Sequence, residues 1–314
     1  MKILITDTAH PVLLQKLQEA GHSCTVMTDC DYDSVLQHIS AYDALVVRSK
    51  IVIDRAFIDR ARNLKCIGRV GAGMETIDVD YAESVGIRCL NSPEGNRDAV
   101  GEHALALLLA LMDKIAVADN EVRQGLWRRE QNRGLEIKGR TVGIIGFGNM
   151  GGAFAQRLQG FECDIVAYDK YKPAGYAPKY VKEVSLAELQ QRSDIISLHV
   201  PLTDETFHMV DSAFFDACAK PVFLVNTSRG AVVNTDHLAE AMRGGKVAGA
   251  ALDVIEFEDM SKDALGLESA PESLRFLLSS QSTVLSPHVA GWTVESKYKL
   301  AAVLADKIIE VLCS

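Results

Sequence analysis

Short apolar runs alternate with stretches of helical periodicity along nearly the whole chain. Helices that separate consecutive strands are typical of parallel sheets, whose strands are buried on both faces and read as continuous apolar runs. A chain of 314 residues is long for one core and commonly forms two domains. We therefore predict an α/β protein with two doubly wound parallel sheets. The predicted strands are residues 3–5, 23–27, 44–47, 64–70 and 87–90 in a first series, and 141–145, 164–168, 194–199, 222–226 and 247–252 in a second.

Two positions separate these series into domains. We place one boundary near residue 95, before an apolar helical stretch at 98–122, and the other near residue 288. The stretch at 98–122 is apolar almost all round, which is typical of a buried helix and equally of a subunit interface. The last segment, 293–312, also has helical periodicity. Spacing alone leaves open whether this segment completes the first domain.

Composition and charge exclude several classes of protein. The net charge of −9 argues against a general nucleic-acid-binding protein, which needs a basic face. The longest apolar stretch, 104–112, is about half of the roughly 20 residues that cross a bilayer. The 7 cysteines include no CxxC pair, so no disulfide framework and no metal site is indicated. Because the N-terminal MKILITD lacks the long apolar core of a signal peptide, we expect a cytoplasmic protein without a membrane partner.

The strongest local motif is a glycine-rich turn between a predicted strand and a predicted helix. Residues 141–151 read TVGIIGFGNMG, and a helix is predicted over 153–158. Gly146 permits the tight turn, Gly148 lets the backbone approach a pyrophosphate, and Gly151 allows the helix to pack closely on the strand. The free N–H groups at the helix start and its positive dipole end favour phosphate. The expected dinucleotide contacts in this turn are Gly146, Phe147, Gly148, Asn149, Met150 and Gly151.

An acidic residue follows the next strand at the distance that this motif requires. Asp169 lies 18 residues beyond Gly151, directly after the predicted strand 164–168. A carboxylate at this position accepts a hydrogen bond from a ribose 2′-hydroxyl and repels a 2′-phosphate, so the sequence favours NAD over NADP. Lys170 and Lys172 weaken that preference, because a cation beside the ribose attracts a 2′-phosphate. A glycine-rich turn without a ligand is the alternative.

Three charged residues stand where later strands end. Arg229 follows strand 222–226, Glu258 lies beyond strand 247–252, and His288 follows the apolar pair at 284–285. Ligands of open α/β sheets bind outside the carboxyl ends of the strands. An Arg binds a carboxylate in bidentate fashion, a His exchanges a hydroxyl proton near neutral pH, and a carboxylate beside the His fixes its tautomer. The remaining histidines are interpreted as surface or packed side chains: His10, His22, His38, His103, His199, His208 and His237.

Several motifs together resemble the D-isomer-specific 2-hydroxyacid dehydrogenase family over nearly the whole chain. They are GIIGFGNMG at 143–151, HVPLTDET at 199–206, NTSRGAVV at 226–233, AGAALDV at 248–254 and SPHVAG at 286–291. The resemblance implies two Rossmann-like domains with a discontinuous substrate domain built from both chain ends. On this basis we assign residues 1–95 and 288–314 to the substrate-binding domain and 96–287 to the NAD-binding domain.

The resemblance also implies roles for individual residues. Arg229 is implied to bind substrate, His288 to donate or accept the proton, and Glu258 to be the partner of His288. Asp253 is implied to receive the nicotinamide carboxamide, while Pro201, Thr206 and Thr227 lie in motifs that contact the cofactor. The family commonly has Pro directly after its Glu, whereas Asp259 follows Glu258 here. Glu256 is therefore a rival partner for His288, although the spacing from Asp253 favours Glu258.

Substrate choice is expected to lie in the first domain. The resemblance implies that backbone N–H groups of Gly71, Ala72 and Gly73 hold the substrate carboxylate, although the residues alone indicate only a plain turn. Arg48 and Arg69 resemble positions with which the phosphoglycerate-oxidising members meet the substrate phosphate, and residues 91–103 resemble those members too. A doubly charged phosphate needs two or more cations. Arg48 as a carboxylate-orienting residue is the alternative. Further positive charge stands at Arg128, Arg129 and Arg133.

The expected activity is the NAD-dependent oxidation of 3-phospho-D-glycerate to 3-phosphohydroxypyruvate, a reaction of serine biosynthesis. The resemblance implies a homodimer formed through 98–122, with a phosphorylated 2-hydroxy acid as the small-molecule substrate. Reduction of hydroxypyruvate, glyoxylate or another 2-oxo acid is the alternative within the same class. A transcriptional corepressor that senses NADH is the alternative from a different class. Because the sequence ends with the helical segment 293–312, we expect no serine-sensing domain in it.

Overall fold

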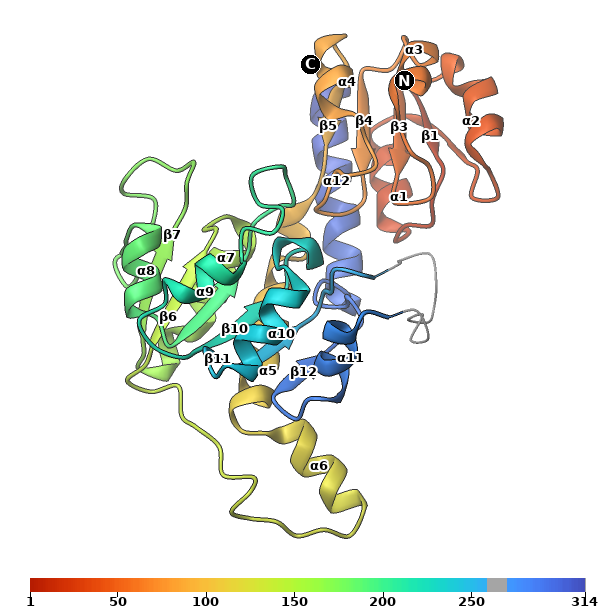
Figure 1. Cartoon of the computed structure of the whole chain (residues 1–314). Coiled ribbons are helices and arrows are strands. Elements are labelled where there is room, and N and C mark those ends of the chain that lie inside the picture. The colour runs from red at the N-terminus through yellow and green to blue at the C-terminus, as the bar shows by residue number, and fades with distance from the viewer. Residues whose placement is uncertain (259–269, 314) are drawn as a thin grey trace. The chain divides into compact units, whose positions relative to one another are not determined.

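The computed structural model describes residues 1–258 and 270–313, and it confirms the predicted α/β class (Figure 1). The chain divides into two compact units, Met1–Arg97 with Trp292–Ser314, and Asp98–Gly291. Each unit is built on one sheet, and the described strand pairs are parallel. The first unit is discontinuous, as the resemblance implies, because the C-terminal helix packs against N-terminal elements.

The first unit contains a five-stranded sheet in the order β2-β1-β3-β4-β5. Side chains along each strand alternate between two buried clusters, so that Leu4 of β1 packs on one face and Ile3 and Ile5 on the other. Its strands are β1 Lys2–Ile5, β2 Ser23–Val26, β3 Ala44–Val47, β4 Cys66–Arg69 and β5 Arg88–Leu90. Its helices are α1 Val12–Glu19, α2 Tyr32–His38, α3 Arg55–Arg60, α4 Val79–Ser84 and α12 Val294–Cys313, with the 3-10 turns η1 Ile39–Ala41 and η2 Pro93–Gly95.

Helix α12 belongs to the core of the first unit. Leu304 and Ile308 are fully buried in the cluster that Ile3 and Ile5 also join. Burying each such side chain contributes about 1.5–3 kcal/mol to folding. Gly68 of β4 allows the helix to approach the sheet, since a Cβ at this position would lie 2.9 Å from Ile308 Cδ1. The 20 residues of this helix thus supply part of the core of the first unit.

The second unit contains a seven-stranded sheet in the order β12-β11-β10-β9-β6-β7-β8. Its strands are β6 Thr141–Ile145, β7 Asp164–Tyr168, β8 Lys182–Glu183, β9 Ile195–Leu198, β10 Val222–Asn226, β11 Val247–Leu252 and β12 Thr283–Leu285. Its helices are α5 Arg97–Met112, α6 Ile115–Arg123, α7 Asn149–Leu158, α8 Leu186–Arg192, α9 Ser212–Asp216, α10 Thr235–Arg243 and α11 Glu272–Ser279, with the 3-10 turns η3 Gln159–Phe161 and η4 Gly230–Val232.

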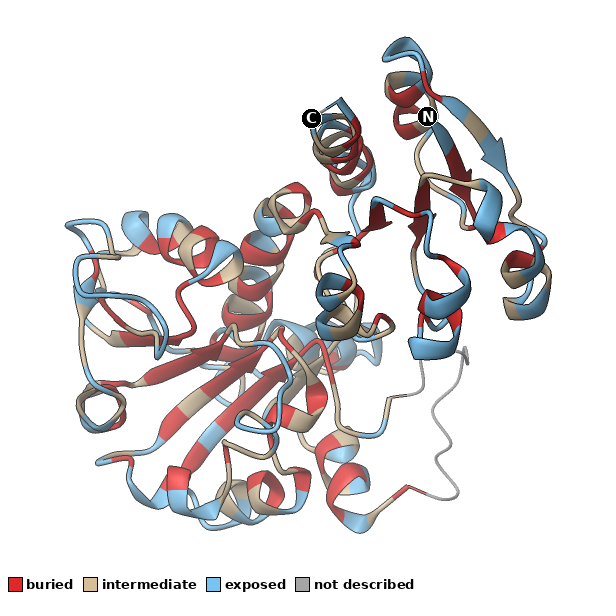
Figure 2. Ribbon diagram, turned by 90° about the horizontal axis from the view of Figure 1, so that it is seen from above, coloured by how far each residue is buried: buried red, intermediate tan, exposed pale blue. Residues whose placement is uncertain are grey.

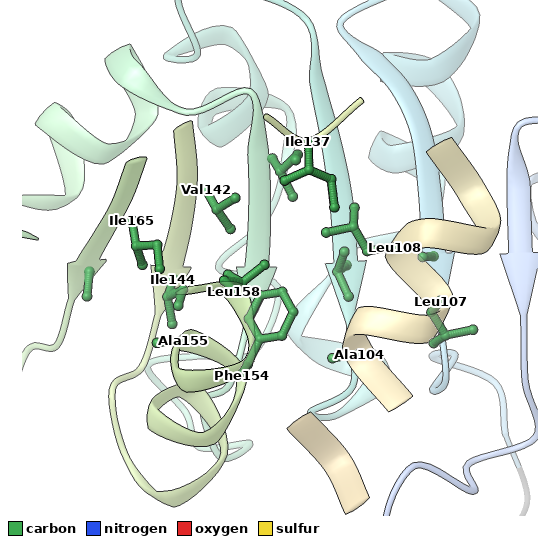
Figure 3. Packing of buried hydrophobic residues seen from close by; sticks show 14 of the residues in the cluster. Ala104, Leu107, Leu108, Ile137, Val142, Ile144, Phe154, Ala155, Leu158 and Ile165 are labelled. Carbon is green, nitrogen blue, oxygen red and sulfur yellow. The ribbon is translucent and has the colours of Figure 1, made fainter. Parts of the chain in front are cut away.

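Two apolar layers sandwich this second sheet. Ile144 of β6 faces a cluster with Phe154 and Leu158 of α7 and Leu108 of α5 (Figure 3). Ile145 belongs to the opposite cluster. The central strands are buried along most of their length, as Figure 2 shows. This burial on both faces is why the strands read as continuous apolar runs.

The structure corrects the expectation of one helix over 98–122. Helix α5 ends at Met112 and α6 begins at Ile115, with Lys114 between them in the left-handed region at φ 54°. A backbone in that region cannot continue a right-handed helix. The apolar face of α5 packs in the core of the second unit, while Ile115 and Val122 of α6 are exposed.

The two points at which the chain passes from one unit to the other also lie two to four residues beyond the expected boundaries. The units divide after Arg97 and after Gly291, so His288 belongs to the second unit and not to the first. The His288 N–H donates to the Asp253 backbone carbonyl at 2.7 Å, which ties His288 to the second unit. Among the described residues, no helix is both long and apolar enough to cross a membrane.

Candidate active site

The candidate residues of the second unit follow the carboxyl ends of its strands. Strand β6 has β7 on one side and β9 on the other, so the chain reverses its direction of travel across the sheet at β6. Such a switch point creates a crevice outside the strand ends. The glycine turn follows β6, Asp169 follows β7, and Arg229 follows β10. Asp253 follows β11, and His288 follows β12 beyond Leu285.

The glycine turn has the close backbone contacts that its sequence predicts. Gly146 adopts φ +87°, and a Cβ there would lie 2.5 Å from the carbonyl oxygen of His199. A Cβ at Gly151 would lie 2.1 Å from the carbonyl oxygen of Gly146. Gly148 differs, because a Cβ there would point into open space, with no described atom within 4 Å. A side chain at the first or third glycine would thus clash with backbone atoms, and the second leaves room for a ligand.

Two observations at the carboxyl ends of this sheet's strands fit a dinucleotide. Helix α7 begins at Asn149, and no side chain of residues 1–258 or 270–313 caps its N-terminus, so its first N–H groups are available to a pyrophosphate. The Thr227 hydroxyl, two residues before Arg229, is buried and has no hydrogen-bond partner among the described residues. A buried hydroxyl without a partner carries a free-energy cost that a bound polar group removes.

Asp169 lies against the glycine turn. Its Oδ2 accepts a hydrogen bond from the Phe147 N–H at 2.9 Å, and its Oδ1 accepts one from the Tyr171 N–H at 3.1 Å. The two lysines beside it are already engaged: Lys170 Nζ lies 2.8 Å from Glu205 Oε2, and Lys172 Nζ donates to the Phe147 carbonyl. The cations that weakened the preference for NAD thus have partners within the protein.

Pro201 and Thr206 form the turn that carries Glu205. The Thr206 hydroxyl donates to the Pro201 carbonyl at 2.6 Å and accepts from the Thr203 N–H at 2.8 Å. The observed role of Thr206 is therefore to close this turn. A direct contact of either residue with a cofactor stays a prediction.

The structure brings His288 and Glu258 together. His288 Nδ1 lies 3.0 Å from Glu258 Oε1, and both side chains are about three-quarters buried, with exposed fractions of 26% and 23%. With Nδ1 hydrogen-bonded to the carboxylate, Nε2 is the nitrogen left to exchange a proton. The rival Glu256 instead contacts His208 Nε2 through its Oε1 at 2.5 Å. The departure from the family pattern at Asp259 lies outside the described residues.

Asp253 anchors the loop that carries His288. Its Oδ1 accepts hydrogen bonds from the Ser286 hydroxyl at 2.6 Å and the Val289 N–H at 2.9 Å, with His103 Nε2 at 3.4 Å, and its Oδ2 accepts from the Ala290 N–H at 2.9 Å. Burial raises the pKa of Asp253, but these donors outweigh burial and the pKa lies below its usual value. The carboxylate is thus ionised although it is only 1% exposed.

Arg229 is held at the end of β10. Its Nη1 donates to the Ser228 carbonyl at 2.7 Å, and its own carbonyl accepts from Asn226 Nδ2 at 2.9 Å. The side chain is half-buried. Since β10 and β11 pair with Asn226 opposite Leu252, Arg229 and Asp253 follow neighbouring strand ends.

The predicted substrate residues of the first unit lie at the carboxyl ends of its strands. Arg48 follows β3, and Arg69 ends β4 beside it, with Val47 opposite Arg69 in the register. Arg69 Nε donates to the Arg48 carbonyl at 3.0 Å, and a Cβ at Gly71 would lie 2.4 Å from Arg69 Nη1. The Arg48 guanidinium stacks 4.7 Å from the centre of the Trp292 ring.

The loop after Arg69 is fixed from β5. Asn91 Nδ2 donates to the Ala72 carbonyl at 2.6 Å, and the Ser92 N–H donates to the Gly71 carbonyl at 2.9 Å. The Gly71 N–H donates to the Arg69 carbonyl, whereas those of Ala72 and Gly73 have no acceptor among the described residues. These two N–H groups are available to a ligand.

Sequence reasoning missed the partners of two histidines. His103 of α5 contacts both Ser286 and Asp253, and His208 contacts Glu256. Each pair is separated by more than 40 positions, so no local pattern indicates it. The interpretation of His199 as a packed side chain is confirmed: its ring packs against Phe154, its Nε2 lies 2.8 Å from Ser197 Oγ, and burial lowers its pKa to about 3.

Comparisons with known proteins agree with this geometry. The family model for the NAD-binding domain of D-isomer-specific 2-hydroxyacid dehydrogenases matches residues 105–290. A D-3-phosphoglycerate dehydrogenase from Archaeoglobus fulgidus is 35% identical over 312 residues, which are 99% of this chain and 57% of that protein. A hydroxypyruvate reductase from Thermotoga maritima is 37% identical over 280 residues, 89% of this chain and 88% of that protein.

A solved structure shows the same fold. The D-lactate dehydrogenase of Aquifex aeolicus, complexed with NAD and lactic acid, superimposes with a TM-score of 0.81 and 26% identity, covering 100% of this chain and 94% of that one. The chain spans little more than half the length of the curated phosphoglycerate dehydrogenases that it matches. It belongs to the D-isomer-specific 2-hydroxyacid dehydrogenase family, and its second unit is an NAD-binding domain of that family.

Proposed function

We propose that this chain carries an NAD-dependent D-3-phosphoglycerate dehydrogenase, which oxidises 3-phospho-D-glycerate to 3-phosphohydroxypyruvate. The observation that carries the proposal is the pair Arg48 and Arg69 at neighbouring strand ends, beside a loop in which two N–H groups have no acceptor in the described part of the chain. In a protein of net charge −9, this local positive charge suits a substrate with a carboxylate and a phosphate.

The second unit supplies the groups for the chemical step. His288 Nε2 takes the proton of the C2 hydroxyl, while Glu258 on Nδ1 stabilises the imidazolium that forms. Arg229 binds the substrate carboxylate and polarises the C2 oxygen. Bound NAD⁺ supplies the acceptor for the hydride that leaves C2. Asp253 keeps the His288 loop in place, and we assign the nicotinamide carboxamide to the same strand end.

The first unit supplies the groups for recognition. The Ala72 and Gly73 N–H groups donate to the carboxylate, and Arg48 and Arg69 meet the phosphate. A phosphate carries nearly two negative charges at pH 7, so a single arginine would leave it incompletely balanced.

The names of the relatives support the proposal at the level of the family. Proteins named D-3-phosphoglycerate dehydrogenase and hydroxypyruvate reductase both match nearly all of this chain. The second candidate function is the reduction of an unphosphorylated 2-oxo acid. The Arg48–Trp292 stack favours this candidate, since a guanidinium held over an indole ring is partly committed within the protein.

We also propose a homodimer formed through the surface of α6 and the segment after it. Ile115, Val122 and Trp127 are 56%, 51% and 78% exposed there, and burying such large apolar side chains against a second copy would be favourable. The three arginines at 128, 129 and 133 lie in the same segment.

Substrate preference tests the proposed function directly. With NADH, we expect kcat/KM for 3-phosphohydroxypyruvate to exceed that for hydroxypyruvate, glyoxylate and pyruvate by 100-fold or more, about 2.7 kcal/mol of transition-state binding. In Arg48→Met this ratio falls at least tenfold, because the phosphate loses one cation. Arg55→Met, which removes an exposed arginine of the same unit, leaves the ratio unchanged. A wild-type preference for an unphosphorylated acid establishes the second candidate, and NADH binding without any turnover favours the corepressor.

Cofactor choice is tested at Asp169. Replacing it by asparagine keeps a hydrogen-bond acceptor beside Phe147 and removes the charge that repels a 2′-phosphate. We expect the preference for NADH over NADPH, measured as the ratio of dissociation constants, to fall at least tenfold. Asp164→Asn, at the opposite end of the same strand, is the control. An unchanged ratio in Asp169→Asn would contradict the ribose contact.

A further inference from the structure

We propose that His208 and Glu256 form a positioning pair, which holds Glu256 away from His288 and fixes the backbone that presents Glu258. The inference rests on the proposed function, in which Glu258 is the partner of His288. Both glutamates stand within three residues of each other, and each contacts a histidine through its Oε1. The structure therefore contains two His–Glu pairs whose glutamates are close in sequence, and one of these pairs has no place in the reaction.

Both side chains of the pair are mostly buried, and both carboxylate oxygens of Glu256 have a hydrogen-bond partner. His208 Nε2 lies 2.5 Å from Glu256 Oε1, and the two side chains are 27% and 17% exposed. Glu256 Oε2 accepts a hydrogen bond from the Thr235 N–H at 3.0 Å, at the first residue of α10. A carboxylate at a helix N-terminus is stabilised by the helix dipole.

Asn234 determines which nitrogen of His208 carries the proton. The Asn234 side-chain oxygen accepts the His237 N–H at 3.0 Å, so its amide nitrogen is the atom that faces His208 Nδ1 at 3.3 Å. An amide N–H needs an acceptor, and Nδ1 is therefore unprotonated. Nε2 then carries the hydrogen that is donated to Glu256.

The pair is joined to the Glu258 backbone by a short turn. The Glu258 N–H donates to the Ile255 carbonyl at 3.3 Å, so Glu256 and Phe257 are the residues inside the turn. Gly230 allows this turn to lie directly on the Arg229 segment, since a Cβ at Gly230 would lie 2.1 Å from the Ile255 carbonyl carbon. Holding the Glu256 side chain in place therefore also holds the backbone of the turn that ends at Glu258.

The same histidine is joined to the Arg229 segment through its backbone. The His208 N–H donates to the Ala231 carbonyl at 2.8 Å, two residues after Arg229. His208 adopts φ 51°, in the left-handed region that costs a residue other than glycine about 1–3 kcal/mol. That cost is sustained because its side chain and backbone bind two different segments of the proposed active site.

Loss of the His208 side chain has a specific consequence. Glu256 then keeps its charge but loses its hydrogen-bond partner. It becomes a second carboxylate beside Glu258 that can compete for His288. His208→Asn is the suitable variant, because Asn tolerates the left-handed region and its side chain is too short to reach Glu256. Glu256→Gln tests the other side: its amide offers one acceptor oxygen where His208 and Thr235 require two.

A double-mutant cycle separates positioning from simple destabilisation. We expect His208→Asn and Glu256→Gln each to lower kcat about tenfold, with KM for the acid and the dissociation constant of NADH within twofold of wild type. In a Glu258→Gln background, each causes less than a twofold further loss, because both act through Glu258. If the His208–Glu256 pair only stabilises the fold, each substitution lowers kcat by the same factor in wild type and in Glu258→Gln. That outcome overturns the proposal. His237→Asn, another histidine of the same unit, leaves kcat unchanged.

A second measurement needs no substrate and keeps this inference separate from the proposed function. In a crystal structure of His208→Asn we expect Glu258 to have left hydrogen-bonding distance of His288 Nδ1. If the pair remains at the 3.0 Å seen here, the positioning role is wrong, whatever acid the enzyme uses. If the pair separates while no acid is turned over by wild type, the positioning role stands and the proposed function fails.

Discussion

Replacing His288 by asparagine is expected to lower kcat by about 10²–10⁴-fold, the usual contribution of a positioned general base. Asparagine cannot exchange a proton near neutral pH. It does keep the local backbone, because His288 adopts φ 53° and asparagine tolerates the left-handed region. The His288 N–H hydrogen bond to the Asp253 carbonyl belongs to the backbone and is retained.

Single-turnover kinetics with NADH and 3-phosphohydroxypyruvate measure this loss. Because the glycine turn lies at other strand ends, we expect the dissociation constant of NADH to stay within about twofold. His38→Asn, a histidine of the first unit at the end of α2, is the control and should match wild type. A single-turnover rate within threefold of wild type in His288→Asn would exclude His288 as the proton-transfer group.

The architecture could be predicted from the sequence because its signals are local. Each apolar run followed by a helix is a short-range pattern, and parallel pairing then places all strand ends at one edge. That geometry is why Arg229 and His288 can be selected together from their positions after predicted strands. The glycine-rich turn is interpretable for the same reason, as its three glycines lie between one strand and the helix that follows it.

The remaining features depend on contacts between distant residues. Helix α5 ends because Lys114 adopts φ 54°, and lysine is not a residue type whose presence predicts the left-handed region. The choice between Glu256 and Glu258 depends on His208, which lies 48 positions before Glu256. The assignment of His288 to the second unit depends on Asp253, 35 positions earlier in the chain. The spacing from Asp253 favours Glu258 correctly, but local spacing does not reveal the distant partner that holds Glu256.

Removing the charge of Asp253 is expected to destabilise the second unit by about 3 kcal/mol, because a buried charge that accepts several hydrogen bonds is difficult to replace. Asparagine offers one acceptor oxygen, whereas Ser286, Val289 and Ala290 all donate to the carboxylate of Asp253. At least one buried N–H or O–H group is left without a partner. The loop that carries His288 loosens as a result, and we expect kcat to fall about 100-fold.

The pH dependence of this effect follows from the lowered pKa of Asp253. A carboxyl group whose folded-state pKa lies below its unfolded value of about 3.9 stabilises the protein fully above that value. Its contribution is lost as the pH falls through the folded-state pKa. The difference in stability between wild type and Asp253→Asn should therefore be constant near neutral pH and shrink below about pH 4.

Calorimetric unfolding and amide exchange measure both parts of this prediction. Exchange at Val289 and Ala290, whose N–H groups donate to Asp253, should accelerate in Asp253→Asn even where the rest of the sheet stays protected. Asp216→Asn removes an exposed carboxylate of the same unit and should change neither quantity. If Val289 and Ala290 keep their protection in Asp253→Asn, another contact holds the His288 loop. Changes in exchange at other amides would not alter that conclusion, because the hydrogen bonds of Val289 and Ala290 both end on the Asp253 side chain.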